Sequence, residues 1–191
     1  MVLAHNMVSR FFVLQVMTGE EARFIDLARQ TLMRLDTDSS EIRLWWPRRK
    51  LLIRRRGRRL SSLAPLFPGY VFLEAEDITD AVFRALRGCR GFVRFLLDNR
   101  DIRPLLDADL ELIRHFLSFG EIVQPSRVEF DIENRIVVRD GPLKGLEGQI
   151  VKVDKRKRRA KVRLDMYEDS FFIDLGFEIM EPRRKETDVA S

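Results

Sequence analysis

Cysteine and histidine are the scarcest chemically versatile residues of this chain. Among its 191 residues are one cysteine, Cys89, and two histidines, His5 and His115. A single cysteine excludes an intramolecular disulfide and is typical of a protein in a reducing cytosol. Three such residues, far apart in sequence, do not make a metal site. We therefore expect no metal, no cofactor and a cytoplasmic location.

Long apolar runs are also missing. No stretch approaches the roughly 18 consecutive apolar residues of a membrane span. The beginning of the chain lacks the charged region, apolar core and small-residue cleavage site of a signal peptide. We expect no membrane contact, and we consider Met7 as well as Met1 a candidate native start.

Catalytic motifs are absent as well. The chain has no glycine-rich phosphate loop, no nucleophile elbow and no cysteine–histidine pair. The carboxylates of Asp107 and Asp109 stand at an expected helix start, where helix capping explains them better than acid–base chemistry. We interpret the chain as a binding protein and not as an enzyme.

Basic residues are plentiful and segregated. The formal net charge is +5, yet residues 48–59 hold eight basic residues and no acid, and residues 152–163 hold eight basic residues and one acid. The two segments together carry +15, so the remainder of the chain carries −10. Two positive patches on an otherwise acidic protein are the electrostatic footprint of a polyanion binder, although each could be only a solvated loop.

The first two thirds of the chain predict alternating strands and helices. Residues 10–16 are apolar enough for a central strand, and residues 20–35 predict a helix whose buried stripe is Phe24, Leu27, Leu32 and Leu35. Residues 42–53 predict a β-hairpin with a basic extension. Asp77 or Thr79 is expected to cap a second helix, and Asp107 a third.

The last third predicts consecutive strands. Residues 149–153 and 160–164 are expected to pair as a hairpin with a loop of four or six residues. Placing the valines on one inner face sets Val153 opposite Val162, Lys152 opposite Arg163, and Asp154 opposite Lys161. The loop and outer face of this hairpin are then almost entirely cationic.

Four ordered segments resemble one known family. The segment from Asp140 to Asp154, with Gly148 as signature glycine, resembles the KOW motif. Phe11-Phe-Val-Leu-Gln15, Phe67-Pro-Gly-Tyr-Val71 and Gly91-Phe-Val93 are similar to characteristic segments of the NusG family of transcription factors. The resemblance covers roughly residues 10–182.

This resemblance implies an α+β protein of two domains. Residues 1–118 are expected to form a NusG-type N-terminal (NGN) α/β sandwich that binds RNA polymerase, and residues 134–182 a small β-barrel KOW domain. Residues 119–133 are the expected linker, and residues 183–191 a disordered tail. The expected partner is the clamp helices of the largest polymerase subunit, and the expected state is a monomer. The candidate docking residues are Phe12, Phe67, Pro68, Tyr70 and Phe92.

The basic residues are candidates for nucleic-acid contact. Those of the KOW segment are expected to bind an RNA hairpin in a nascent leader transcript, and are Lys144, Lys152, Lys155, Arg156, Lys157, Arg158, Arg159, Lys161 and Arg163. Those of the first basic run are candidates for upstream duplex or non-template DNA, or for RNA, and are Arg48, Arg49, Lys50, Arg54, Arg55, Arg56, Arg58 and Arg59. Trp45 and Trp46 beside that run can stack on a base or pack in the sheet.

Three functions stay open at this point. Leu143 and Leu146 fall where the housekeeping NusG branch carries an apolar patch for Rho or a ribosomal protein, and Glu168-Asp169 replace its usual Gly-Arg. Together with the cation cluster, these departures resemble the LoaP branch, whose members are antiterminators that bind an RNA hairpin. The alternatives are a housekeeping NusG that couples polymerase to Rho or the ribosome, and a KOW-type ribosomal protein.

Overall fold

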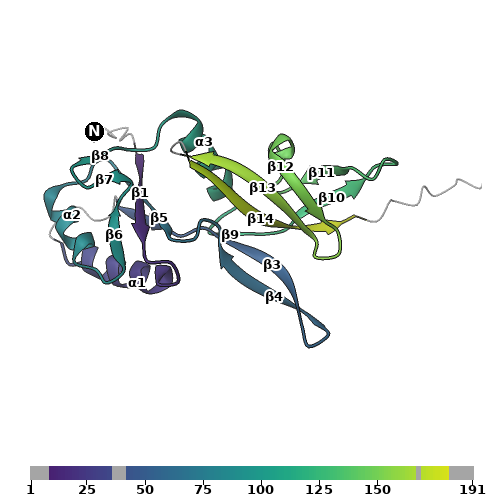
Figure 1. Ribbon diagram of the computed structural model, residues 1–191. Coiled ribbons are helices and arrows are strands. Elements are labelled where there is room, and N and C mark those ends of the chain that lie inside the picture. The colour runs from purple at the N-terminus through teal and green to yellow at the C-terminus, as the bar shows by residue number, and fades with distance from the viewer. Residues whose placement is uncertain (1–8, 36–41, 167–168, 181–191) are drawn as a thin grey trace, which may run out of the picture. The chain divides into compact units, whose positions relative to one another are not determined.

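The computed structural model describes residues 9–35, 42–166 and 169–180. Within them the chain divides into two compact units. The first comprises Met1–Arg48 and Pro65–Ile122, and the second comprises Arg49–Ala64 and Val123–Ser191. The architecture is mixed, with three α-helices among many strands (Figure 1). The segment 49–64, which contains the first basic run, belongs to the same unit as the C-terminal strands. The expected N-terminal domain, in contrast, was continuous over residues 1–118.

Four strands form the main sheet of the first unit. In spatial order they are β2 (Arg43–Trp45), β5 (Tyr70–Ala75), β1 (Arg10–Val16) and β6 (Phe92–Phe95). β1 pairs antiparallel with both β5 and β6, so that Leu14 has Val71 on one side and Phe95 on the other. This position confirms the predicted central strand. A separate two-stranded pair is formed by β7 (Leu97–Asp98) and β8 (Asp101–Ile102).

The helices of the first unit begin in different ways. They are α1 (Glu21–Leu32), α2 (Asp80–Arg87) and α3 (Asp107–Leu117). The Thr79 hydroxyl accepts a hydrogen bond from the Val82 amide at 3.3 Å, which confirms one of the two predicted caps of α2. The predicted cap of α3 is wrong, because the N-cap residue is Leu106 and Asp107 is the first helical residue, with φ of 47°.

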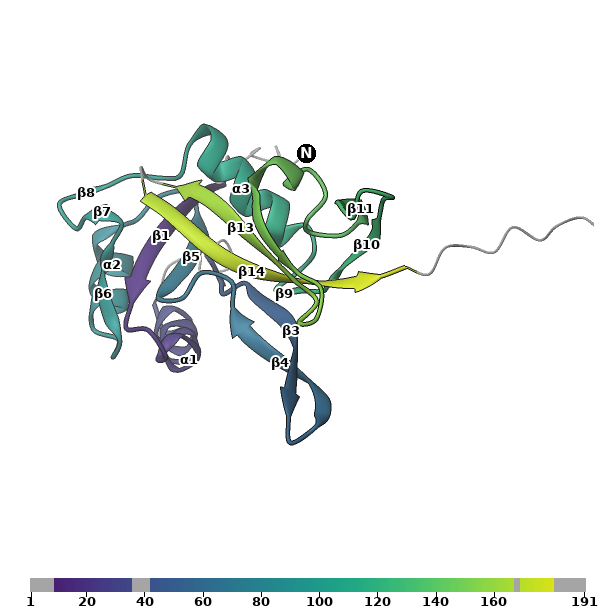
Figure 2. The ribbon, with the colours of Figure 1, turned by 45° about the vertical axis from the view of Figure 1, so that its right-hand side comes forward.

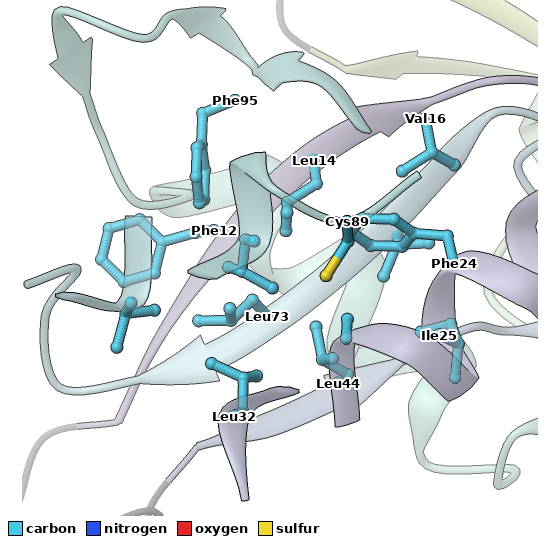
Figure 3. Packing of buried hydrophobic residues seen from close by; sticks show 14 of the residues in the cluster. Phe12, Leu14, Val16, Phe24, Ile25, Leu32, Leu44, Leu73, Cys89 and Phe95 are labelled. Carbon is cyan, nitrogen blue, oxygen red and sulfur yellow. The ribbon is translucent and has the colours of Figure 1, made fainter. Parts of the chain in front are cut away.

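Side chains from α1, α2 and all four main strands make the core of the first unit (Figure 3). The buried stripe of α1 consists of Phe24, Ile25, Ala28 and Leu32, whereas Leu27 is exposed, so the predicted stripe was shifted. Cys89 is a free thiol inside this core, and its Sγ lies 3.3 Å from the Ala85 carbonyl oxygen. Its burial assigns it a packing role.

One buried carboxylate joins α1 to the loop before β5. Glu21 is only 2% exposed, and its two oxygens accept hydrogen bonds of 2.8 Å from the backbone amides of Gly19 and Gly69. Gly69 has φ of 81°, and a Cβ there would lie 2.9 Å from the Thr18 hydroxyl. The conformation of the Phe67-Pro-Gly-Tyr70 segment therefore requires glycine at position 69, and a charge-assisted hydrogen bond to Glu21 stabilises it.

Five strands form the sheet of the second unit. In spatial order they are β11 (Ile136–Asp140), β10 (Ser126–Phe130), β14 (Asp169–Ile179), β13 (Arg159–Met166) and β12 (Ile150–Asp154). β10 and β14 are parallel, and the other neighbours are antiparallel. β10 lies inside residues 119–133, so part of the expected linker is a sheet strand. A 3-10 turn, η2 (Glu147–Gln149), precedes β12.

The β12–β13 hairpin differs in register from the prediction. Asp154 pairs with Arg159, which leaves a loop of four residues, one of the two expected lengths. With this loop length Val153 faces Ala160 and Lys152 faces Lys161, and an irregularity between Ile150 and Lys152 then places Ile150 opposite Val162. Val151 lies at this irregularity and is exposed, whereas Val162 and Leu164 are buried. The expected pairing of Val153 with Val162 is therefore wrong.

A second hairpin carries the first basic run. It consists of β3 (Arg48–Arg55) and β4 (Arg58–Pro65), and β3 also neighbours β9 (Ile122–Val123). Arg56 and Gly57 between the strands both have positive φ, 50° and 77°. Two positive φ values in a two-residue loop suit the twist of a tight hairpin. A basic β-hairpin is therefore present as predicted, but it spans residues 48–65 and not the expected 42–53.

β3 passes close beside β14 in the second unit, as Figures 1 and 2 both show. A Cβ at Gly176 would lie 3.0 Å from the Lys50 carbonyl oxygen and 3.5 Å from Pro125. The Arg159 guanidinium donates a 3.3 Å hydrogen bond to the Leu52 carbonyl. Gly176 therefore permits the close approach of β3, and the Arg159 hydrogen bond attaches the basic hairpin to the five-stranded sheet.

Replacing Glu21 by alanine should lower the free energy of unfolding by about 3 kcal/mol, because two backbone amides then lose a charged acceptor. Urea denaturation measures this change. The exposed Glu76 offers the matched control, and Glu76→Ala should change stability by less than about 0.5 kcal/mol. Equal stability of the two variants would contradict the role given to Glu21.

Gly176→Ala should destabilise the second unit by about 1–3 kcal/mol, because the added methyl group pushes β3 away from β14. The φ of Gly176 lies outside the left-handed region, so the loss reports the contact and not backbone strain. Hydrogen exchange of the β3 amides should become faster. Gly148→Ala is the control, since a Cβ there meets nothing within 4 Å. Unchanged exchange in Gly176→Ala would disprove the close approach.

Candidate nucleic-acid interface

The four-residue loop between β12 and β13 concentrates cations around one carboxylate. Asp154 Oδ1 accepts a 2.8 Å hydrogen bond from the Lys157 amide, and Oδ2 lies 3.9 Å from Lys157 Nζ. The hydrogen bond from Lys157, followed by the nearby charges of Lys157, Arg156 and Lys152, lowers the pKa of Asp154 below its ordinary value. The carboxylate thus stays ionised well into the acidic range and orders the loop.

The two ends of the basic segment are attached to the fold. Lys155 Nζ lies 3.7 Å from the centre of the Phe130 ring and donates a hydrogen bond to Asn134 Oδ1. Arg159 is half-buried and contacts Leu52, whereas Arg156 and Lys157 are exposed. Lys155 is exposed as well and Arg158 is half-buried, so the solvent-facing cations of this segment are Lys155, Arg156 and Lys157.

The outer face of the hairpin extends this positive surface. Lys152, Lys161 and Arg163 are exposed on adjacent strands, and Lys161 lies opposite Asp174 of β14. Like charges that face each other across strands are destabilising, and Asp174 offsets the Lys152–Lys161 pair. Arg163 pairs with Asp165 at 3.2 Å and lies opposite Phe172, which is 59% exposed.

Lys144 belongs to a different part of the second unit. It lies between β11 and η2, and its Nζ lies 3.4 Å from the Val138 carbonyl oxygen. The other eight predicted RNA-binding residues all come from β12, β13 or the loop between them. The structure therefore gathers those eight in one hairpin and leaves Lys144 outside it.

The first basic run divides into buried and exposed parts. Burial lowers the pKa of the Arg49 guanidinium below its ordinary value, with Asp174 opposing the shift and Arg159 adding to it. Arg48 lies 4.9 Å from the centre of the Trp46 ring, and Lys50 is half-buried. Arg56 and Arg58 at the tip are exposed, and the side chains of Arg54, Arg55 and Arg59 lie outside the described residues. Arg48, Arg49 and Lys50 are thus half-buried, whereas the exposed cations among the described side chains of the run are those at the tip.

The neighbouring tryptophans are engaged within the first unit. Trp45 Nε1 donates a 2.9 Å hydrogen bond to Glu74, and the ring is half-buried. Trp46 packs against the hydrophobic core. Both arrangements support strand packing over base stacking, the two alternatives considered for these residues.

The two basic segments line one cavity in the second unit, of about 590 Å³. Its walls come from β3, the β12–β13 loop and the end of β14. The lining residues are Leu52, Ile53, Lys155, Arg156, Lys157, Arg158, Arg159 and Ile179. Sequence analysis treated the segments as two separate patches, because no local pattern reveals that β3 docks beside Gly176.

The candidate polymerase-docking residues differ in exposure. Phe12 and Phe67 are each 1% exposed, and Phe67 stacks edge-on against Phe72 and Phe116. These two phenylalanines belong to the core, which corrects the expectation that all five residues border a surface. Pro68 is exposed, and Tyr70 and Phe92 are half-buried.

Sequence analysis missed a hollow of the first unit. It has a volume of about 320 Å³ and lies between α1 and β2, with Leu32, Met33, Ile42 and Trp45 among its lining residues. The only sequence signals for this hollow were the apolar residues Met33 and Ile42, which the structure shows to be exposed and half-buried. Both lie at the ends of elements, where the spacing of apolar residues says little about burial.

Neither a metal-binding cluster nor a membrane-spanning helix is found in the described part of the chain. No cluster of three histidine, cysteine or acidic residues there could hold a metal ion. No helix among the described residues has both the length and the apolar character needed to cross a membrane.

Comparisons with known proteins agree on one family. A family model described as transcription termination factor NusG matches residues 9–114. The transcription termination/antitermination protein NusG of Buchnera aphidicola is 27% identical over 174 residues, covering 90% of this chain and 95% of that protein. The protein of the same name from Yersinia pestis is 25% identical over 175 residues, covering 90% and 95%.

The fold agrees with this match. The solved structure of Thermotoga maritima NusG superposes with a TM-score of 0.58 at 20% identity, covering 89% of this chain and 94% of that one. At this identity the likeness concerns the fold alone. The family model, in contrast, matches more than half of the sequence. The chain therefore belongs to the NusG family of transcription factors.

Proposed function

We propose that this protein is a transcription antitermination factor that docks on the clamp helices of RNA polymerase and binds a structured RNA. One observation carries the RNA-binding part: eight basic residues gather on the β12–β13 hairpin, and Lys152, Arg156, Lys157, Lys161 and Arg163 among them are exposed. Arginine and lysine at this density suit the phosphates of a folded RNA. The protein acts by binding, and its residues perform no chemical step.

The proposed domains follow the family organisation. Residues 1–118 form the NGN domain, 119–133 the linker, 134–182 a KOW-type barrel, and 183–191 the tail, which lies outside the described residues. The strand positions favour two changes within this scheme. β10 joins the C-terminal sheet from inside the linker, and the β3–β4 hairpin associates with that sheet as well.

The proposed branch is the one represented by LoaP. In the housekeeping branch, the positions of Leu143 and Leu146 belong to an apolar surface patch. Here Leu143 is 0% exposed and Leu146 is 8% exposed, so neither supplies such a patch. Glu168, one of the two residues that replace the usual Gly-Arg, lies outside the described residues. Loss of the apolar patch and gain of a cationic hairpin both favour an RNA partner over Rho or a ribosomal protein.

A housekeeping role is the second candidate. It is favoured by the relatives, whose names combine termination and antitermination. Binding of purified Rho with an affinity similar to that for leader RNA would support it. A ribosomal role has less support, since the family match covers residues 9–114, outside the KOW segment.

The triple variant Lys152→Gln, Arg156→Gln and Lys161→Gln should lose most binding to a leader RNA hairpin. All three side chains are exposed, and none of them makes a hydrogen bond or ion pair described above, so the change removes mainly charge. The slope of log affinity against log salt should become shallower by about 2, because fewer counterions are released. Filter-binding titrations at several salt concentrations measure both quantities.

The control for this variant removes three charges elsewhere. Arg84, Arg87 and Arg90 are exposed at or after the end of α2, and their replacement by glutamine should leave RNA binding unchanged. Equal losses in the two triple variants would indicate generic attraction of a polyanion. A scrambled RNA of equal length, bound as tightly as the leader hairpin by wild type, would also contradict the proposed recruitment by RNA.

Tyr70→Asp should weaken binding to the polymerase clamp helices strongly, because a carboxylate buried at an interface costs several kcal/mol, on the order of 3–5. Tyr70 is half-buried at the start of β5, next to the exposed Pro68. Tyr70→Phe is the matched control and should retain most binding. Full binding by a folded Tyr70→Asp protein, measured by calorimetry with the isolated clamp helices, would remove Tyr70 from the interface.

A further inference from the structure

The cavity lined by both basic segments is amphipathic. Leu52 and Ile53 of β3 and Ile179 at the end of β14 supply apolar surface, and Ile179 is 39% exposed. The remaining lining residues are the five consecutive cations from Lys155 to Arg159, and none of the described lining residues is a carboxylate. Its volume of about 590 Å³ is suited to a small planar group with a charged substituent.

The cavity is held in place from several sides. Gly176 lets β3 approach β14, and Arg159 connects the loop to the Leu52 carbonyl. Asp154 orders the loop through the Lys157 amide. The Arg159 Nε–H group is buried without a hydrogen-bond partner, so this guanidinium retains a donor for an anionic group.

We propose that this cavity binds one unpaired nucleotide, with its base against Leu52, Ile53 and Ile179 and its phosphate against the cations of the loop. The inference deepens the proposed function, on which it rests for the identity of the polymer as RNA. A fully paired duplex keeps its bases stacked inside the helix and can offer only phosphates. An apolar wall beside the cations is useful only to a base that has left the stack.

One consequence concerns the two basic segments. They act as a single binding site for the same strand, with β3 as one wall and the β12–β13 loop as the other. The polymer is either an RNA with a bulged or looped nucleotide or an unpaired DNA strand. Both offer the same base and phosphate, and the experiment separates them.

The test uses the full-length protein and a hairpin RNA that carries one unpaired 2-aminopurine, beside a fully paired hairpin of equal charge. Wild type should bind the bulged RNA about tenfold more tightly than the paired one, as expected for one accommodated base. The 2-aminopurine fluorescence should rise on binding, because the base leaves its stacked neighbours for an aliphatic pocket. The same pair of hairpins made of DNA identifies the preferred source of the nucleotide.

A charge placed on the apolar wall tests the site directly. Ile179→Glu should weaken binding of the bulged RNA about tenfold more than binding of the paired RNA, because the added charge repels both RNAs but only the unpaired base meets the apolar wall. The matched control Leu106→Glu adds the same charge at a residue 65% exposed in the first unit and should bind like wild type. The fluorescence response of wild type tests the cavity even where a variant folds poorly.

The outcomes separate the cavity from the proposed function. Tight but equal binding of both RNAs, without a fluorescence change, overturns the nucleotide site and leaves RNA binding intact. A larger preference for the bulged DNA supports the cavity and assigns it to an unpaired DNA strand. Absence of binding to any of the four hairpins overturns the inference together with the proposed RNA-binding function.

Discussion

Repulsion between two cationic segments is the constraint that the second unit must satisfy. The segments 48–59 and 152–163 hold 16 of the 35 basic residues of the chain, yet β3 and the β12–β13 loop within them lie next to each other. Asp174 offsets this repulsion, because it faces Lys161 across the sheet and attracts Arg49 of β3. Asp154 offsets the repulsion within the loop, where its carboxylate accepts a hydrogen bond from the Lys157 amide. Two carboxylates and a glycine contact thus allow a concentration of charge that would otherwise separate the hairpin from the sheet. The concentrated charge is then available to a polyanion.

Local patterns in the sequence were sufficient for much of the fold. The apolar run of β1 and the Thr79 cap of α2 were predicted, since each depends on a few neighbouring residues. The basic hairpin was predicted as a hairpin, although over residues 42–53 and not 48–65. The register of β12 and β13 was not predicted, because it depends on the length of the loop between them, and the loop sequence did not decide between four and six residues. The shift of the α1 stripe from Leu27 to Ile25 and Ala28 likewise depends on which side of the helix the sheet covers.

The sequence predicted which basic residues belong to the candidate site, but not how they are arranged in space. Counting charges found both basic segments, whereas the burial of Arg49 and the shared cavity depend on contacts between residues more than a hundred positions apart. The same limit applies to the apolar residues. Phe12 and Phe67 belong to segments typical of the family, and only packing shows that they face inward while Pro68 and Tyr70 do not. Burial of Leu143 and Leu146 is the corresponding finding in the second unit, and it removes a surface that sequence position alone would have suggested.

The parallel pairing of β10 with β14 has a consequence for the order in which the protein is made. β12 and β13 can pair as soon as both have left the ribosome, since a four-residue loop closes with little loss of chain entropy. β10 can pair with β11 early, but its pairing with β14 and the docking of β3 beside β14 must wait for a strand that follows both in the chain. Contacts of such large sequence separation form slowly. The nascent protein therefore completes the β12–β13 hairpin before β3 has its docking partner, and the cavity is the last feature of the second unit to mature.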